Sequence, residues 1–135
     1  MPATKLQKTA PKKVLLVEDE ADMCLLLNIM LTGDEMEVDH VKTLGEAREY
    51  LDASKPAVVI LDNRLPDGFG IDFITSIKQS HPETRVIMIS GTDGAAKDVA
   101  LENGADAFLV KPFTKVQLYE TVKSQLNIET VSTAS

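Results

Sequence analysis

Short apolar segments alternate with longer segments of helical periodicity along most of this chain. Four of the short segments contain no charged or polar side chain: Val14–Val17, Val58–Leu61, Val86–Ile89 and Phe108–Val110. Such runs are typical of parallel strands that are covered on both faces. Met36–Val41 contains acids and a histidine, so we predict a more exposed strand there. The alternation therefore favours a parallel sheet whose strands are joined by helices.

Five segments with helical spacing follow the five strands. They are Ala21–Leu31, the segment after Thr43, the segment from Gly70, Asp93–Asn103 and the segment that begins at Thr114. Thr43 with Glu46, and Thr114 with Gln117, match the capping-box pattern of a helix N-terminus. Because each strand is followed by a helix, we predict an α/β fold of the doubly wound type, with helices on both faces of the sheet and right-handed crossovers.

The acidic balance of the chain narrows the classes of partner. Its 135 residues suit one domain and carry a net charge of −7. Four lysines and no acid lie in the first 13 residues, so the net charge of the rest is −11, four lower than the total. Such a composition disfavours direct binding to nucleic acid or to an anionic membrane, and it suits cations or a basic protein surface. No apolar run approaches the roughly 20 residues needed to span a bilayer, and the basic start lacks the apolar core of a secretory signal.

The single cysteine and the two histidines do not form a metal-binding pattern. Cys24 lies in an apolar helical segment, where we predict an inert core side chain. His40 and His81 lie far apart and have no cysteine beside them in the sequence, so we predict no zinc site. One cysteine allows no disulfide within the chain, which agrees with a reducing, cytoplasmic environment.

Charged and hydroxyl-bearing residues gather directly after four of the predicted strands. Along the chain, the residues at these positions are Glu18, Asp19 and Glu20, then Asp62, Asn63 and Arg64, then Ser90, Gly91 and Thr92, and finally Lys111 and Pro112. Functional sites of open α/β sheets lie outside the carboxyl ends of the strands. If these four strands are neighbours, carboxylates, a hydroxyl and an ammonium group converge at one edge of the sheet.

Converging carboxylates need a counter-charge, since they cannot all remain ionised side by side. Mg²⁺ supplies one, and it is typically held by one or two carboxylates, water and phosphate oxygens. A lysine and a hydroxyl are the donors that an incoming phosphoryl group requires. An Asp beside Mg²⁺ can itself accept that group. The residue types therefore predict a site for an aspartyl phosphate and Mg²⁺.

Four motifs carry a resemblance to a known family. VLLVEDE, LDNRLPDGFG, MISG and LVKPF stand in the order, and on the elements, typical of the receiver domain of two-component response regulators. The chain resembles such a domain, of the chemotaxis-regulator type, from about Lys12 to Leu126. The resemblance implies a flavodoxin-like three-layer (βα)5 sandwich with a five-stranded parallel sheet in the order 2-1-3-4-5. It divides the chain into a flexible N-terminal extension (1–12), the receiver domain (13–127) and a flexible tail (128–135).

The same resemblance implies a metal site. Asp62 would be the phosphoacceptor and a Mg²⁺ ligand, Asp19 would bind Mg²⁺ directly, and Glu18 would assist through water. The backbone carbonyl of Arg64 would also face the metal. Glu18 stands where the family commonly has Asp, which changes the reach of this acid. We interpret Glu20 as an acid of the first helical turn, where negative charge is favourable.

The resemblance also implies which groups hold the phosphoryl group and respond to it. Lys111 would pair with the phosphoryl oxygens, and Ser90 would donate its hydroxyl to them. Phe108 stands at the family's aromatic switch position, where it would change rotamer with the phosphorylation state. Pro112 matches the family's cis-proline.

The implied function is a phosphorylation-activated signalling switch, not an enzyme with an external substrate. A histidine kinase or phosphotransfer protein would donate the phosphoryl group. The face built from the helix over Asp93–Asn103, the strand at Phe108–Val110 and the last helix would then control a downstream protein or an output domain.

Three other functions share parts of the pattern. A phosphatase of the haloacid-dehalogenase type also uses an Asp after a strand, but it needs an acid two residues later, where this chain has Arg64. An FMN-binding flavodoxin shares the strand order, but its phosphate-binding loop needs glycines and hydroxyls where this chain has acids. A constitutive adaptor, which binds a partner without phosphorylation, is disfavoured by the intact set of Asp62, Ser90 and Lys111.

Overall fold

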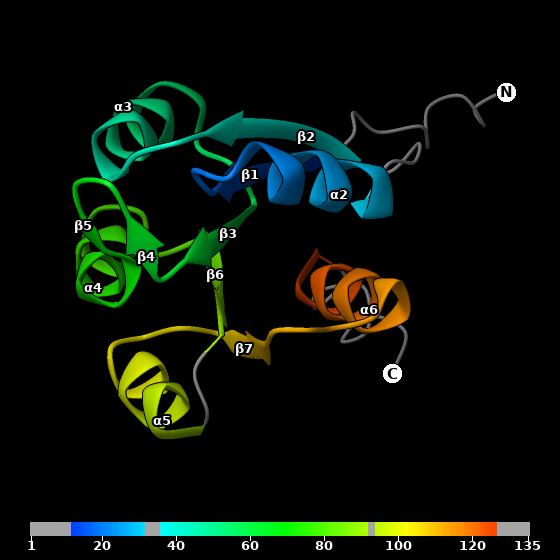
Figure 1. The fold of residues 1–135 in the computed structure, drawn as a ribbon. Coiled ribbons are helices and arrows are strands. Elements are labelled where there is room, and N and C mark those ends of the chain that lie inside the picture. Colours follow the sequence, from blue (N-terminus) through cyan, green and yellow to red (C-terminus); the bar gives the residue numbers. More distant parts are fainter. Residues whose placement is uncertain (1–11, 32–35, 92–93, 127–135) are drawn as a thin grey trace, which may run out of the picture.

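The computed structural model describes residues 12–31, 36–91 and 94–126. Their central feature is a parallel sheet of β1 (Lys12–Val17), β2 (Met36–Val41), β3 (Val58–Asp62), β6 (Arg85–Ser90) and β7 (Ala107–Val110) (Figure 1). A separate hairpin consists of β4 (Arg64–Leu65) and β5 (Gly68–Phe69). The sheet has the order β2-β1-β3-β6-β7. This confirms the predicted order 2-1-3-4-5, because the hairpin strands only shift the numbering.

The strands extend slightly beyond the predicted apolar runs. β1 begins at Lys12, inside the predicted N-terminal extension, whereas residues 1–11 and 128–135 lie outside the described residues. At the other end, Asp62 and Ser90 are the last residues of β3 and β6 and not the first residues of loops. Each is in register with a residue of the neighbouring strand, so the sheet holds both backbones in place.

Helices cover both faces of the sheet. They are α2 (Ala21–Leu31), α3 (Leu44–Ser54), α4 (Gly70–Ser80), α5 (Gly94–Glu102) and α6 (Lys115–Leu126). In Figure 1, α2 and α6 lie side by side on one face, and α3, α4 and α5 lie on the other. The predicted three-layer architecture is therefore confirmed. The helix predicted over Asp93–Asn103 ends one residue earlier, at Glu102, and Asp93 lies outside the described residues.

The two-residue period of a strand explains the three layers. In β1, Leu15 and Val17 point into the core beneath α3, α4 and α5, whereas Val14 and Leu16 point into the core beneath α2 and α6. All four side chains are fully buried. Because successive residues of a strand face opposite sides, a run without polar residues needs cover on both. Burial of each such side chain contributes about 1.5–3 kcal/mol, which favours two helical layers over one.

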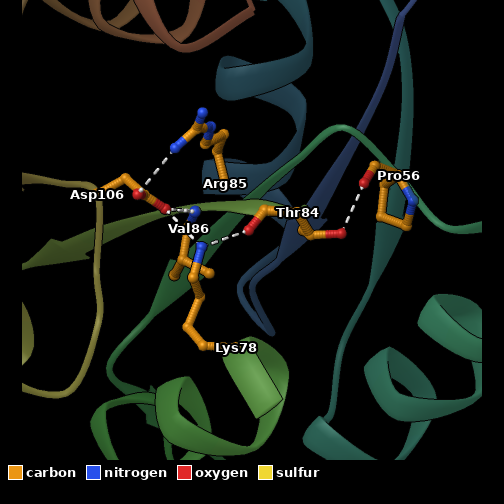
Figure 2. Close-up of polar contacts among 6 residues, drawn as sticks. All are labelled: Pro56, Lys78, Thr84, Arg85, Val86 and Asp106. Carbon is orange, nitrogen blue, oxygen red and sulfur yellow. Dashed lines mark hydrogen bonds and ion pairs between the residues drawn. The ribbon is translucent and has the colours of Figure 1, made fainter. Parts of the chain in front are cut away.

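A polar brace closes the end of the sheet opposite to the carboxyl ends of the strands (Figure 2). Asp106, just before β7, accepts hydrogen bonds from the backbone N of Val86 at 2.8 Å and from Lys78 Nζ at 3.1 Å. Lys78 also donates to the carbonyl of Thr84 at 2.8 Å, and the Thr84 hydroxyl donates to the carbonyl of Pro56 at 2.9 Å. The Asp106 brace thus ties α4 to the amino ends of β3, β6 and β7.

The capping box predicted at the start of α6 is complete. The one predicted at the start of α3 is present in half, because Glu46 Oε1 accepts from the backbone N of Lys42 at 2.8 Å and not from that of Thr43. At the start of α3, the Thr43 hydroxyl accepts from the backbone N of Glu46 at 3.0 Å. At the start of α6, Thr114 and Gln117 exchange side-chain to backbone hydrogen bonds of 3.0 and 2.9 Å. These bonds satisfy N–H groups that have no partner within the helix. None of the helices in the described ranges is long and apolar enough to cross a membrane.

Candidate functional site

The carboxyl ends of β1, β3, β6 and β7 surround an open cavity of about 460 Å³. It is lined by Asp19, Glu20, Asp62, Asn63, Arg64, Ser90, Gly91 and Lys111. The sequence predicted that residues from these four strand ends converge. The structure confirms this, because the four strands are consecutive neighbours in the sheet. Thr92 lies outside the described residues.

Three carboxylates meet at the ends of β1 and β3. Glu18, Asp19 and Asp62 each place one oxygen so that all three oxygens lie within 4.8 Å of one another. Glu18 and Asp62 are only 1% and 6% exposed, whereas Asp19 is exposed. In the part of the chain that the structure describes, no other three acids, histidines or cysteines lie this close. Glu20 lines the cavity but does not belong to this group.

Glu18 carries an unsatisfied oxygen. Its Oε2 accepts a hydrogen bond from the backbone N of Glu20 at 3.2 Å, whereas its buried Oε1 has no hydrogen-bond donor. Burial, followed by the charge of Asp62, raises the pKa of Glu18 to about 7. A hard divalent cation suits such a place, because it takes oxygen ligands and compensates for several carboxylate charges. The orphan oxygen and the clustered acids therefore fit Mg²⁺.

Lys111 places a positive charge against these acids. Its Nζ lies 2.9 Å from Asp62 Oδ1 and 3.8 Å from Glu18 Oε1. Burial acts to lower the pKa of Lys111, but the hydrogen bond and charge of Asp62 outweigh this effect and raise the pKa. The backbone N of Lys111 donates to the Ser90 carbonyl at 2.8 Å, and the bond between Lys111 and Pro112 is cis, as the resemblance implied. One ammonium group cannot balance three ionised carboxylates, which leaves room for a divalent cation.

The loop between β3 and α4 folds back tightly beside the acids. The Asn63 carbonyl accepts from the backbone N of Gly70 at 2.7 Å, and the Asn63 side chain accepts from that of Ile71 at 3.0 Å. A Cβ on Gly70 would lie 2.3 Å from the carbonyl oxygen of Asp62, so only glycine lets α4 begin here. Sequence reasoning missed both this closure and the β4–β5 hairpin, because two-residue strands show no period.

The remaining predicted residues lie at different depths. Ser90 is buried and lines the cavity. Arg64 also lines the cavity, but it is exposed. Phe108 is not among the lining residues. It is half-buried in β7 and packs against the core beneath α3, α4 and α5.

Cys24 and His40 lie together in space, although neither histidine has a cysteine beside it in the sequence. Cys24 is buried as predicted, but its Sγ lies 2.7 Å from His40 Nε2. Both atoms also lie near the carbonyl oxygen of Glu18, at 3.1 and 3.0 Å. Burial raises the pKa of the Cys24 thiol. The contact joins residues 16 positions apart, and only the pairing of β2 with β1 brings His40 next to α2.

Residues 14–123 match the family model for the response regulator receiver domain. This chain belongs to the response regulator receiver family. The receiver domain is 36% identical over 118 residues to the response regulator protein PilR of Pseudomonas aeruginosa. It is 35% identical over 121 residues to the KDP operon transcriptional regulatory protein KdpE of Escherichia coli. These alignments cover 87% and 90% of this chain but 26% and 54% of the relatives, so the chain spans about half of their length or less.

The fold of the receiver domain also agrees with solved structures. A signal receiver domain from Vibrio parahaemolyticus is similar with a TM-score of 0.84 and 29% identity, over 92% of this chain and 96% of that chain. Receiver domains belong to two-component response regulators and act in phosphorylation-dependent signalling, and they generally bind Mg²⁺ at an acidic pocket. The family inferred from the four sequence motifs is thus confirmed.

Proposed function

We propose that Asp62 is the phosphoacceptor of this receiver domain and that its phosphorylation, assisted by Mg²⁺, switches the domain between two states. The arrangement around Asp62 carries this proposal. Its carboxylate lines the cavity, accepts a hydrogen bond from the Lys111 ammonium at 2.9 Å, and is grouped with Asp19 and with Glu18, whose Oε1 has no hydrogen-bond donor. Asp62 therefore has the Lys111 ammonium beside it and room for a metal cation, which suits an Asp that acts as a nucleophile.

The metal would be held by the acids of β1 and β3. Asp19 and Asp62 would bind it directly, Glu18 would assist through water, and the backbone carbonyl of Arg64 would complete the set. When bound, Mg²⁺ neutralises the carboxylates and the oxygens of the incoming phosphoryl group. The Glu18 backbone is held on both sides for this role, since its N–H donates to the Val41 carbonyl at 3.1 Å and its carbonyl contacts the Cys24–His40 pair.

The transfer itself is a displacement at phosphorus. A carboxylate oxygen of Asp62 attacks the phosphorus of a phosphohistidine on the donor protein, and the new O–P bond forms as the P–N bond breaks. The imidazole nitrogen leaves with the electron pair of that bond. Lys111 pairs with the transferred oxygens and Ser90 donates its hydroxyl to them, so both stabilise charge without forming a bond to phosphorus.

A histidine kinase or phosphotransfer protein would supply the phosphoryl group. α2 begins two residues after Asp19, and it exposes large apolar side chains at Leu25, Leu26 and Ile29, which are 61%, 46% and 59% exposed. Apolar surface gathered beside a site favours protein docking. We infer that the donor covers this face in the cytoplasm, and that this chain itself contacts neither nucleic acid nor membrane.

The output would leave through the face formed by α5, β7 and α6. Ser90 ends β6, and Phe108 lies in the adjacent strand β7. A shift of the Ser90 hydroxyl toward the phosphoryl group would favour a new rotamer of Phe108, which is a population shift driven by one added dianion. This face exposes apolar side chains that a downstream protein or an output domain could cover: Val99, Leu101, Val110 and Val116.

Incubation with Mg²⁺ and acetyl phosphate, followed by intact-mass spectrometry, tests the proposal. We expect the protein to gain one phosphoryl group, and we expect no gain for Asp62→Asn or in the presence of EDTA. A phosphatase would instead turn over a generic phosphomonoester. A constitutive adaptor would gain no phosphoryl group from any small donor, and that result would overturn the proposal.

A further inference from the structure

Asp67 joins two parts of the receiver domain that are far apart in the sequence. It lies in the turn between β4 and β5, and its carboxylate accepts two hydrogen bonds from the start of α3. Oδ1 accepts from the backbone N of Leu44 at 2.9 Å, and Oδ2 accepts from that of Gly45 at 3.0 Å. These bonds lower the pKa of Asp67. They satisfy the first N–H groups of the helix, where negative charge is favourable.

The same turn packs against the helix through Gly68. This glycine has a φ of +151°, and a Cβ on it would lie 3.0 Å from Leu44 Cδ1. The Leu44 side chain therefore occupies the space beside Gly68 that a larger residue would need. Hydrogen bonds and van der Waals contact together seat the tip of the hairpin on the N-terminus of α3.

The β4–β5 hairpin depends on such outside anchors. It contains two residue pairs, Arg64 with Phe69 and Leu65 with Gly68. A two-stranded hairpin is marginal without further packing. Leu65 packs against the core and the Asn63–Gly70 bond closes the base, but the tip is held by Asp67. The Arg64 backbone lies between the base and the tip of the hairpin, so the contacts at both of these ends determine its position.

We propose that Asp67 is a positioning residue for the metal site, because it holds the β4–β5 hairpin against α3 and thereby places the Arg64 backbone beside the clustered acids. This inference rests on the proposed function, in which the Arg64 carbonyl faces Mg²⁺. Asp67 is absent from the lining of the cavity, so its effect passes through the hairpin and not through contact with the metal. Its loss should therefore weaken metal binding while every ligand stays in the chain.

Thr43 offers a matched control. Its hydroxyl caps the same helix by accepting from the backbone N of Glu46 at 3.0 Å, whereas Asp67 accepts from those of Leu44 and Gly45. Thr43→Ala thus weakens the start of α3 without releasing the tip. Asp67→Ala removes both hydrogen bonds, whereas Asp67→Asn keeps one acceptor oxygen. Comparison of these three variants with the wild type separates an effect on the position of the loop from an effect on the stability of the helix.

The test combines Mg²⁺ titration by calorimetry with amide hydrogen exchange at Gly70 and Ile71, whose N–H groups bond to Asn63. We expect Asp67→Ala to raise the Kd for Mg²⁺ about tenfold, as the loss of an outer-shell partner does. We expect it to speed exchange at these two amides by roughly tenfold. Asp67→Asn should lie between Asp67→Ala and the wild type, and Thr43→Ala should match the wild type in both measurements.

Two results would overturn the inference. One is a wild-type Kd and wild-type exchange in Asp67→Ala, and the other is an equal rise of the Kd in Thr43→Ala. If the wild-type protein binds no Mg²⁺, the proposed function fails instead. The exchange comparison then decides alone: faster exchange in Asp67→Ala supports the anchoring role, and unchanged exchange refutes it.

Discussion

Glu18→Gln should stabilise the metal-free protein at neutral pH, although it removes a residue of the candidate metal site. Glu18 is 1% exposed, and burial and the charge of Asp62 raise its pKa from 4.5 to about 7. The folded protein therefore keeps a proton that the unfolded chain releases between these two pH values. Stability contributed by this group is lost as the pH rises through that window, and it stays lost above it.

The size of the effect follows from the pKa. Each tenfold change in proton affinity corresponds to about 1.4 kcal/mol, so the raised pKa of Glu18 costs about 3 kcal/mol of unfolding free energy once the group is ionised. Gln stays neutral at every pH and has nearly the same shape. The difference in stability between Glu18→Gln and the wild type should therefore grow from near zero at about pH 4.5 to about 3 kcal/mol at pH 8.

Urea unfolding followed by circular dichroism, in EDTA and at several pH values, measures this difference. All other groups are the same in the two proteins, so the comparison isolates Glu18. In excess Mg²⁺ the order should reverse, because the cation favours ionised Glu18 and therefore stabilises the wild type more than the variant. Parallel curves for the two proteins from pH 5 to pH 8 in EDTA would refute the reasoning.

Three further substitutions probe other parts of the structure. Gly70→Ala puts a Cβ 2.3 Å from the Asp62 carbonyl oxygen. We therefore expect the free energy of unfolding, measured in urea, to fall by about 2 kcal/mol or more. Wild-type stability would mean that the loop can move to make room for the Cβ. Asp106→Ala removes the acceptor of the brace shown in Figure 2, so we expect the free energy of unfolding to fall by about 2 kcal/mol. The rate of phosphoryl gain from acetyl phosphate at 25 °C should stay the same, because the brace lies at the end of the sheet opposite to the cavity. Lys111→Met removes the ammonium group 2.9 Å from Asp62. Phosphoryl gain should therefore slow about 100-fold, while the affinity for Mg²⁺ should not fall. A wild-type rate of phosphoryl gain in the mass assay would exclude the proposed role of Lys111.

Local patterns carried much of the prediction. The uninterrupted run Val14–Val17 indicated a strand covered on both faces, and its residues do alternate between the two cores. The pair Thr114 and Gln117 indicated a helix start, and the two side chains do cap α6. These features depend on residues within a few positions of each other, so the spacing of residue types along the chain is enough to predict them.

The convergence of Asp19, Asp62, Ser90 and Lys111 also followed from the sequence, because parallel strands place their carboxyl ends at one edge. The sequence pattern did not indicate how deeply each of these side chains is buried. That Oε1 of Glu18 is buried without a donor, and that its pKa is raised, depends on packing around the end of β1. Charge energies change with burial and distance, and neither quantity exists before the chain folds.

The sequence by itself thus determined the strands of the parallel sheet, the helices between them, their order and the residues at the edge of the sheet. Each follows from local periodicity and from the topology that this periodicity permits. The tertiary structure alone decided that Asp67 meets the start of α3 and that His40 meets Cys24. Both contacts join residues 16 or more positions apart. Such contacts are fixed by strand register and helix packing, for which no spacing along the chain is a guide.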